Sequence, residues 1–249
     1  MKPILHTMRP FLAVIPALLL LSACAKDFHG DADYLNPKDT YYYEFVSDKT
    51  SQAIGTVKTR DGVRFIQLDA VSAGFVVNPN EIQDIADGTR VYLQYWTVLS
   101  TITPDFCTDA ILVGWASPIE VGGVSMVNFE ESFSADAIKS ATYSDPMDIV
   151  TDWMTCLEDG FLTLHYRIPT SGEKKHHFSL YQSLYDYNQY YLIHKADGDT
   201  KGSVTDGIVC FDVSHRLPNT EGKTVKLSFV YIDLNHTEKR LTFDYCSPK

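Results

Sequence analysis

The sequence has 249 residues and a formal net charge of −11, because 32 aspartates and glutamates outnumber 21 lysines and arginines. Nucleic-acid phosphates and anionic lipid surfaces repel an acidic chain, so we expect neither as a partner. Its 15 tyrosines and 13 phenylalanines, with glycine and proline between short apolar segments, are typical of a β-rich protein.

The amino-terminal segment has the parts of a bacterial lipoprotein signal peptide. Lys2 and Arg9 make its start basic, residues 11–21 are apolar, and residues 21–24 read Leu-Ser-Ala-Cys, which has the form of a lipobox. A membrane-spanning helix is the alternative, but it needs about 20 apolar residues, and prolines interrupt this shorter segment. We therefore expect residues 1–23 to be removed and Cys24 to become the first residue.

Lipidation of Cys24 is the expected route to the membrane. A single acyl chain anchors a protein only marginally, whereas several chains, palmitate among them, hold it firmly. Ala25 follows the cysteine in place of the aspartate that usually keeps lipoproteins at the inner membrane. We therefore expect outer-membrane attachment, with the periplasmic and the cell-surface face both open.

Residues 24–40 are polar and predict a flexible tether. Residues 41–120 predict a first domain of short strands, in which Asp61-Gly62 is a signal for a tight hairpin turn. Five strands with a short helical element predict a small OB-like barrel, and a short open meander is the alternative. The strands are expected at residues 53–59, 63–68, 74–77, 90–99 and 109–115.

Residues 121–146 predict a mixed connector, because two consecutive glycines interrupt ordered structure, and one more strand at residues 124–129 and a brief helix at residues 134–141 are candidates within it. Residues 147–249 predict a second domain of closely spaced strands, typical of an antiparallel β-sandwich. In residues 161–168 apolar side chains alternate with Thr163, His165 and Arg167, which predicts a solvated face for these three. The strand-like segments are residues 148–154, 161–168, 174–184, 190–195, 208–213, 224–233 and 239–245. The predicted fold class is all-β, an OB-like barrel followed by a β-sandwich.

Short segments spread along the chain carry a family resemblance. They are GTV at 55–57, FIQLD at 65–69, NPN at 78–80, DGTRV at 87–91, LTLHYRIP at 162–169 and KHHFSL at 175–180. In this order, and with the lipobox, they resemble the NigD-like lipoproteins over nearly the whole mature chain. The resemblance implies an amino-terminal OB-like domain and a carboxy-terminal β-sandwich. It also implies a link to a bacteriocin gene cluster, from which the family takes its name, and no catalytic residue.

The sequence contains none of the common catalytic or cofactor-binding motifs, such as a nucleophile elbow, a zinc-binding helix or a Gly-rich phosphate loop. We therefore expect no enzyme and no cofactor. The best metal candidate is His165 with His176 or His177, which would lie opposite each other if a turn at residues 169–172 joined their strands in a hairpin. A zinc site needs a third ligand, so surface histidines are the favoured interpretation.

Three aromatic residues are candidates for ligand binding. Trp96 lies on a predicted barrel strand, and Tyr185 and Tyr187 belong to a tyrosine-rich segment of the second domain. An exposed aromatic ring with a polar group stacks on sugars or peptides, because one part of it is apolar and the other hydrogen-bonds. Core packing or a plain surface position is the alternative for all three.

Four cysteines follow the lipobox, and an exported protein permits disulfides. If one forms, we expect Cys210 to pair with Cys246, because both lie in late strands of the second domain. Reduced thiols that fill space in the core are the alternative. Cys107 and Cys156 lie in or beside predicted loops.

Together these features predict a non-enzymatic, lipid-anchored protein of the cell envelope that binds a macromolecular partner or a glycan. An accessory or immunity-type factor of a bacteriocin system is the second interpretation, and a metal-dependent enzyme is the third. The identity of the partner and the oligomeric state stay open at this point.

We predict that Cys24→Ser moves the protein from the membrane fraction to the soluble or unprocessed pool, because the acyl chains are its expected anchor. Membrane fractionation of cells that produce the full-length chain measures this. A variant that still sediments as the mature lipoprotein would contradict the lipobox.

Overall fold

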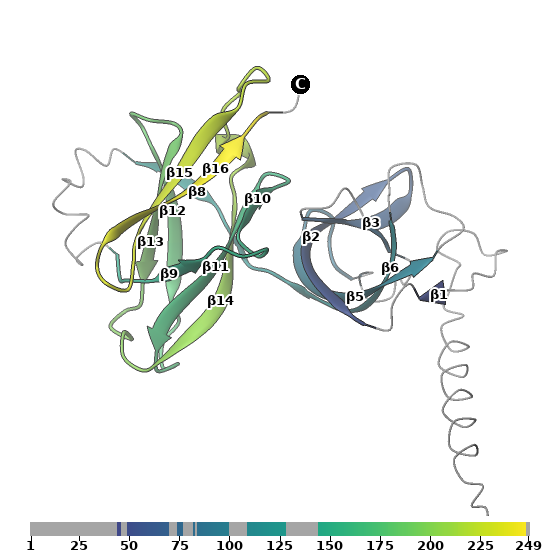
Figure 1. The fold of residues 1–249 in the computed structure, drawn as a ribbon, viewed down its shortest axis with the longest axis horizontal. Helices are drawn as coiled ribbons and strands as arrows, with labels where there is room; N and C mark the ends of the chain where they lie inside the picture. The colour runs from purple at the N-terminus through teal and green to yellow at the C-terminus, as the bar shows by residue number, and fades with distance from the viewer. Residues whose placement is uncertain are drawn as a thin grey trace, which may run out of the picture.

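The computed structural model describes residues 44–45, 49–69, 74–76, 82, 84–99, 109–127 and 144–247. These residues form two β domains, a barrel and a sandwich (Figure 1). Within the described ranges the helical element is a single short turn, η3 (Ser214–Arg216), and no helix is long and apolar enough to cross a membrane. The all-β fold class is therefore confirmed.

The first domain is a closed barrel. Its strands follow the order β5-β2-β3-β4-β6, and a β5–β6 pairing closes the ring, while the short β1 adds to the end of β5. All barrel pairs are antiparallel except β4 with β6. The strands are β1 (Glu44–Phe45), β2 (Ser51–Arg60), β3 (Val63–Leu68), β4 (Gly74–Val76), β5 (Arg90–Leu99) and β6 (Asp109–Pro118). The five predicted strands are present, and their assignment to the OB fold stays a prediction.

The β2–β3 hairpin shows why local sequence predicts this domain well. Asp61 and Gly62 both have positive φ, 53° and 78°, as a two-residue turn between twisted strands requires. The pairing begins directly outside the turn, at Arg60 and Val63. On β5, Val91 and Leu93 are fully buried in the barrel core, as strict alternation predicts.

The second domain is a sandwich of two five-stranded sheets. The first sheet has the order β10-β11-β14-β7, with β9 beside β11, and the second has the order β16-β15-β13-β12-β8. The strands are β7 (Val121–Gly122), β8 (Val124–Val127), β9 (Asp148–Val150), β10 (Cys156–Glu158), β11 (Phe161–Thr170), β12 (His177–Ser183), β13 (Gln189–Lys195), β14 (Ser203–Asp212), β15 (Val225–Ile232) and β16 (Glu238–Tyr245).

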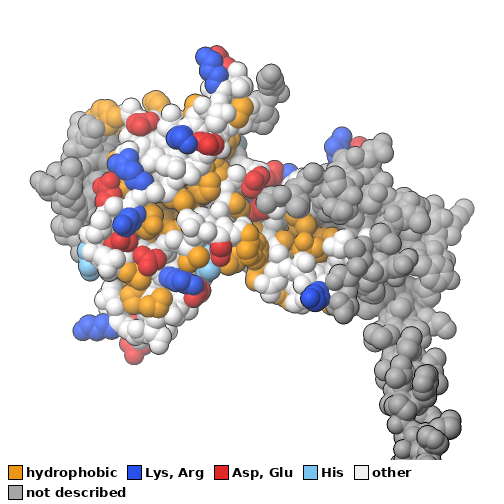
Figure 2. Space-filling view, in the orientation of Figure 1, with side chains coloured by type: hydrophobic (Ala, Val, Ile, Leu, Met, Phe, Trp, Pro, Cys, Tyr) orange, Lys and Arg blue, Asp and Glu red, His pale blue; other side chains and the backbone are white. Residues whose placement is uncertain are grey.

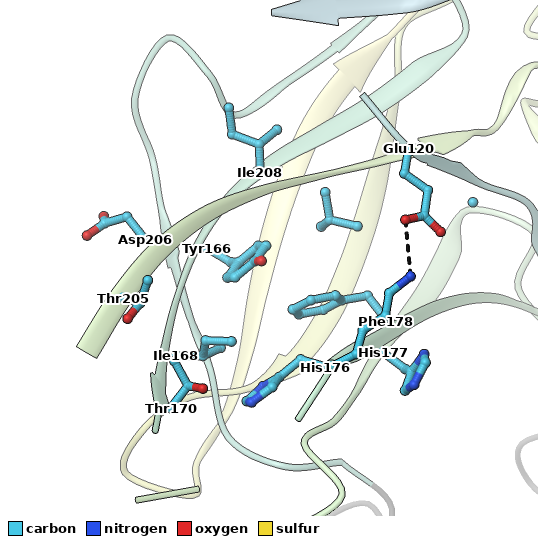
Figure 3. Close-up of a pocket in the computed structure, with 13 residues that line it drawn as sticks. Glu120, Tyr166, Ile168, Thr170, His176, His177, Phe178, Thr205, Asp206 and Ile208 are labelled. Carbon is cyan, nitrogen blue, oxygen red and sulfur yellow. Dashed lines mark hydrogen bonds and ion pairs between the residues drawn. The ribbon is translucent and has the colours of Figure 1, made fainter. Parts of the chain in front are cut away.

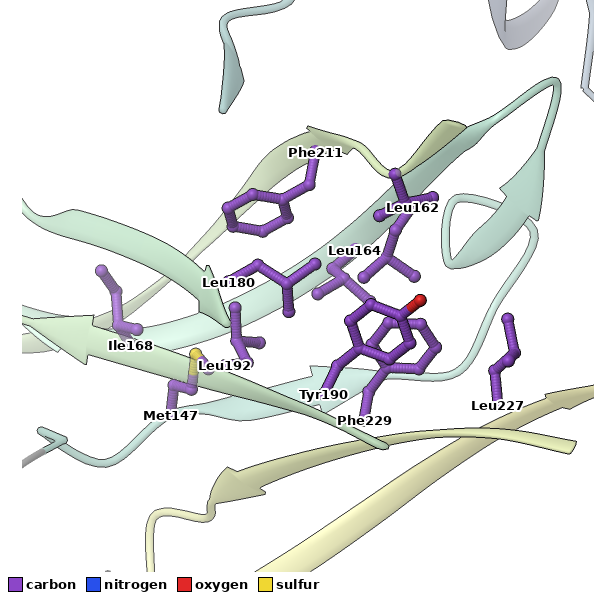
Figure 4. Close-up of a cluster of buried hydrophobic side chains, with 11 residues drawn as sticks. Met147, Leu162, Leu164, Ile168, Leu180, Tyr190, Leu192, Phe211, Leu227 and Phe229 are labelled. Atoms are coloured by element: carbon purple, nitrogen blue, oxygen red, sulfur yellow. The ribbon is translucent and has the colours of Figure 1, made fainter. Parts of the chain in front are cut away.

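The sandwich core lies between these sheets and is built from aliphatic and aromatic side chains (Figure 4). Leu162 and Leu164 enter from β11, Leu180 from β12, and Tyr190 stacks on Phe229 with ring centroids 4.8 Å apart. A fully buried aliphatic or aromatic side chain contributes about 1.5–3 kcal/mol, so this core is the main source of stability in the domain.

Three strand pairs of the sandwich are parallel, so the prediction of purely antiparallel sheets is wrong. They are β7–β14, β8–β12 and β13–β15. β8 lies within the strand that was a candidate at residues 124–129, and β7 adds residues 121–122, so this part of the predicted connector extends both sheets. The candidate helix at residues 134–141 lies outside the described residues. Gly122 does not interrupt the chain. It lets the backbone pass the Phe211 ring, which lies 3.0 Å from where a Cβ at this position would be.

The predicted hairpin between residues 161–168 and 174–184 is also wrong. β11 pairs with β14 along ten residues, and β12 pairs with β13. The chain therefore crosses from one sheet to the other after Thr170. The partner of β11 is a strand that comes much later in the sequence, and local turn signals do not specify such a pairing.

The two domains meet over a buried arginine. Arg90, at the start of β5, is fully buried and forms a two-pronged ion pair with Asp69. Its guanidinium also donates to Thr56 of the barrel at 3.1 Å and to Thr163 of β11 at 3.0 Å. The Phe161 ring packs against the guanidinium, whose Cζ lies 5.0 Å from the ring centroid. The arginine thus binds both domains at once.

This docking buries part of the face of β11 that its alternation predicted to be solvated, whereas Arg167 on the same face is exposed as predicted. Thr163 is completely buried, because the barrel covers it. Beside it, Cys156 of β10 donates its thiol to Asp69 at 3.2 Å, and burial and the Asp69 carboxylate raise its pKa. In Figure 1 β10 lies on the side of the sandwich that faces the barrel, and Figure 2 shows hydrophobic side chains gathered there.

We predict that Arg90→Met lowers the free energy of unfolding by about 3–5 kcal/mol, because it leaves the Asp69 carboxylate buried without its partner. Urea unfolding followed by tryptophan fluorescence measures the change. Lys58→Met is the matched control, because Lys58 and Asp159 form a partly exposed ion pair across the same junction, 2.6 Å long. It should cost less than about 1 kcal/mol. Equal losses in the two variants would contradict a special role for Arg90.

Candidate functional site

A cleft of about 410 Å³ opens at one edge of the sandwich, between β14 of one sheet and β12 of the other (Figure 3). The chain leaves this edge only partly covered. β7 pairs with Cys210 and Phe211, at the end of β14, and β8 pairs with β12 from Leu180 onwards. Within the described part of the chain, residues 203–209 of β14 and 177–179 of β12 therefore have no strand on this side.

A column of stacked rings spans the cleft from sheet to sheet. Tyr166 of β11 lies 4.5 Å from Phe178 of β12, and Phe178 stacks on His194 of β13 at 4.9 Å, measured between ring centroids. His176 lies beside His194, with ring centroids 5.0 Å apart and the two rings hydrogen-bonded edge to edge. Gly207 gives Tyr166 its place, since a Cβ there would lie 2.4 Å from the ring. The cleft floor is therefore rigid and aromatic.

The inner end of the column is polar and buried. His194 Nδ1 lies 3.3 Å from the Asp145 carbonyl oxygen and donates to it, so its Nε2 accepts from His176 Nδ1 at 2.8 Å. Burial and the neighbouring His176 lower the pKa of His194. His176 Nε2 has no hydrogen-bond partner and lies 3.6 Å from Asp199 Oδ2.

Asp199 holds the turn that borders the cleft. Its carboxylate accepts from Ser171 N and Oγ at 2.8 and 2.7 Å, and from Thr170 Oγ1 at 2.8 Å. These hydrogen bonds lower the pKa of Asp199. Asp199 thus ties the turn at residues 197–199 to the start of the segment that crosses between sheets.

His165 lies outside the cleft, on the opposite face of β11, where it is buried between two partly exposed aspartates. Its Nδ1 lies 2.8 Å from Asp152 Oδ2, and its Nε2 lies 2.9 Å from Asp206 Oδ1. Hydrogen bonds from Arg167 and His165 lower the pKa of Asp206. His165 therefore connects the turn after β9 with β14 and has a structural role.

The proposed pairing of His165 with His176 or His177 is wrong, because the histidines belong to different sheets. His176 bonds to His194, and His177 lies on the exposed edge of β12 with its Nε2 4.0 Å from Asp197. Among the described residues, no group of three histidine, cysteine, aspartate or glutamate side chains is placed to hold a metal ion.

The aromatic candidates do not line the cleft. Tyr185 and Tyr187 lie in the turn between β12 and β13, and more than half of each side chain is exposed. Trp96 lies half-buried on β5, with its ring over Gly114. Sequence reasoning missed the cleft residues of β14, although the glycine inside that strand was a signal for close packing against a neighbouring group.

The predicted disulfide between Cys210 and Cys246 is not formed. Cys210 is a buried thiol on β14 that contacts Thr163, whereas Cys246 is exposed and follows β16 in the other sheet. Burial raises the pKa of Cys210, in keeping with a reduced, space-filling thiol. Cys24 and Cys107 lie outside the described residues.

We predict that the protein loses stability as the pH falls below about 6.5. The unfolded chain binds a proton at His194 near that pH, whereas the folded chain, with its lowered pKa, does not. One such proton changes the free energy of unfolding by at most about 1.4 kcal/mol per pH unit. The difference between the urea unfolding midpoints at about pH 7.5 and about pH 5.5 should therefore be smaller in His194→Gln than in the wild type, and it should be unchanged in His177→Gln. Equal pH dependence in all forms would contradict this role.

Comparison with known proteins identifies the second domain. A family model described as the NigD-like C-terminal beta sandwich domain matches residues 126–245. No curated protein matches the chain at a significant level.

Several solved structures share the fold over most of the chain. A candidate toxin-related protein from Parabacteroides distasonis is 22% identical, with a TM-score of 0.58 and coverage of 80% of this chain and 94% of that chain. A NigD-like immunity protein from Bacteroides caccae is 20% identical, with a TM-score of 0.52 and coverage of 82% and 100%.

A candidate lipoprotein from Bacteroides fragilis is 12% identical, with a TM-score of 0.54 and coverage of 81% and 100%. At these identities the likeness establishes the fold alone, so the family rests on the match to the sandwich. The chain therefore carries a NigD-like C-terminal β-sandwich domain, as its sequence resemblance implied.

Proposed function

We propose that this chain is a non-enzymatic, lipid-anchored envelope protein of accessory or immunity type, which binds an extended segment of a protein partner in the cleft. The uncovered edge of β14 beside a rigid aromatic floor is the observation that carries this proposal. Relatives described as an immunity protein and as toxin-related support the role.

An open strand edge binds protein through its backbone. Unpaired N–H and C=O groups along such an edge accept a further strand, and neighbouring pockets select side chains. Natural proteins usually cover or shorten their edges, since an open one also promotes aggregation. In the part of the chain that the structure describes, the edge of β14 stays open over residues 203–209, and the cleft beside it is lined by apolar groups of Ile168, Phe178 and Ile208.

The side chains of the cleft do not form a catalytic arrangement. His194 and His176 bond to each other, and the Asp199 carboxylate is occupied by two hydroxyls and one backbone N–H group. The ion pair of Lys175 with Glu120, 3.3 Å long, is exposed at the rim. Binding rather than bond breaking is the chemistry that this arrangement supports. Attachment through Cys24 to the outer membrane completes the proposal, with a candidate lipoprotein of shared fold as its support.

We predict that a photoreactive p-benzoylphenylalanine in place of Thr205 cross-links one protein of defined mass in intact cells that produce the full-length chain. Thr205 lies on the open part of β14, at the mouth of the cleft. Mass spectrometry identifies the product and the cross-linked segment of the partner.

Lys226 on β15 is the matched control, because it is also exposed on a strand but far from the cleft in the sheet order. The same photoreactive residue at Lys226 should give no such product. Identical products from both positions, or none from Thr205, would reject the cleft as the partner site.

A further inference from the structure

All three tryptophans of the chain belong to one surface that begins at the domain junction. Trp96 and Trp115 lie on the outer face of β5 and β6, and Trp153 lies in the turn between β9 and β10 of the sandwich. Gln52 and Gln94 pair directly across β2 and β5 on the same face. We call these residues, with Tyr92, the tryptophan surface.

The rings of this surface contact one another across the domains. Trp153 stacks on Tyr92 with ring centroids 6.5 Å apart and an angle of 26° between the planes. Trp115 meets Tyr92 edge-on at 5.3 Å. Even so, half of Trp153 and 37% of Trp115 are exposed to solvent. Large aromatic side chains left exposed side by side mark a binding surface more often than a chance arrangement.

The exposed rings are held in place rather than left free to move. Trp115 Nε1 donates to Gln94 at 3.1 Å, and the Tyr92 hydroxyl donates to Gln52 at 2.7 Å. Trp153 sits between Asp152, which binds His165, and Met154, whose backbone N–H donates to Asp152 Oδ1 at 3.0 Å. The bond between His165 and Asp152 thus fixes the turn that presents Trp153. A ligand therefore binds side chains that folding has already ordered, which lowers the entropy cost of binding.

The chemistry of the surface selects a neutral ligand with flat apolar faces and many hydroxyls. Its residues carry no formal charge, although the whole chain carries −11. The rings offer apolar faces. Each glutamine oxygen accepts one hydrogen bond within the surface, from Tyr92 or Trp115, and has a second lone pair for a ligand. Each NH₂ group has two donors, of which Gln94 gives one to Thr50. A sugar ring has a face of C–H groups and a rim of hydroxyls that both donate and accept. A proline-rich peptide also packs on aromatic rings, but its prolines lack the N–H donors that these second lone pairs accept.

We propose that the tryptophan surface binds a neutral carbohydrate chain, whose sugar rings stack on Trp115 and Trp153 while their hydroxyls bond to Gln52 and Gln94. The binding site spans both domains, because Trp153 belongs to the sandwich and the other residues belong to the barrel. It is separate from the cleft, so the cross-linking result at Thr205 and the carbohydrate result stand or fall independently.

Tryptophan fluorescence tests the proposal directly, since every tryptophan of the chain is a reporter from this surface. The lipid-free mature chain is titrated with cellohexaose, xylohexaose, mannohexaose and maltohexaose. At least one should give a saturable change with a dissociation constant below about 10 mM. Trp115→Ala and Trp153→Ala should each weaken that binding about tenfold by calorimetry, because stacking area is lost.

Tyr185→Ala is the matched control, since Tyr185 is an equally exposed aromatic residue outside the surface, and it should bind as the wild type does. Circular dichroism and the urea midpoint verify that the variants are folded. No saturable change with any of the four sugars overturns the proposal. So does unchanged binding by Trp115→Ala and Trp153→Ala, or saturable binding of a proline-rich decapeptide alone.

Discussion

The buried guanidinium of Arg90 is the interaction on which the arrangement of the two domains depends. A charge removed from water is tolerated only when it is paired, and here Asp69 and Thr56 from the barrel and Thr163 from the sandwich accept from the two terminal nitrogens of the guanidinium, while its Nε has no partner. Any shift of one domain against the other would leave the Arg90 charge or another of its N–H groups buried without a partner. The pair therefore selects one docking orientation, even if its net contribution to stability is modest.

That orientation builds the exposed aromatic surface. The outer face of β5 passes from Arg90, under the sandwich, to Tyr92 at its border and Gln94 beyond it. Trp153 reaches Tyr92 only because the sandwich is docked where Arg90 fixes it. The same strand face thus serves as a dry interface at one end and as a wet, amide-lined binding surface at the other.

Polar clusters inside the sandwich position turns and carry no chemistry of their own. Asp152 and Asp206 clamp His165, which fixes the turn after β9, and Asp199 collects hydrogen bonds that fix the turn beside the cleft. The histidines that the sequence suggested as a metal pair lie apart: His165 binds Asp152 and Asp206 outside the cleft, whereas His176 binds His194 at the cleft. The two outward-facing features that remain are the cleft edge and the tryptophan surface, and both suit binding.

The sequence by itself determined the main barrel strands, the Asp61-Gly62 turn, most of the sandwich strands and the all-β class, because alternation and turn residues act over a few neighbouring positions. It missed β10 and the first half of β14. Only the tertiary structure decided which strands pair. β11 takes β14 rather than β12, and β7 and β8, on either side of Gly123, extend both sheets. It also decided that Thr163 and His165 are buried and that Cys210 stays apart from Cys246. These outcomes depend on groups tens of residues apart meeting in space, and no local pattern records such a meeting.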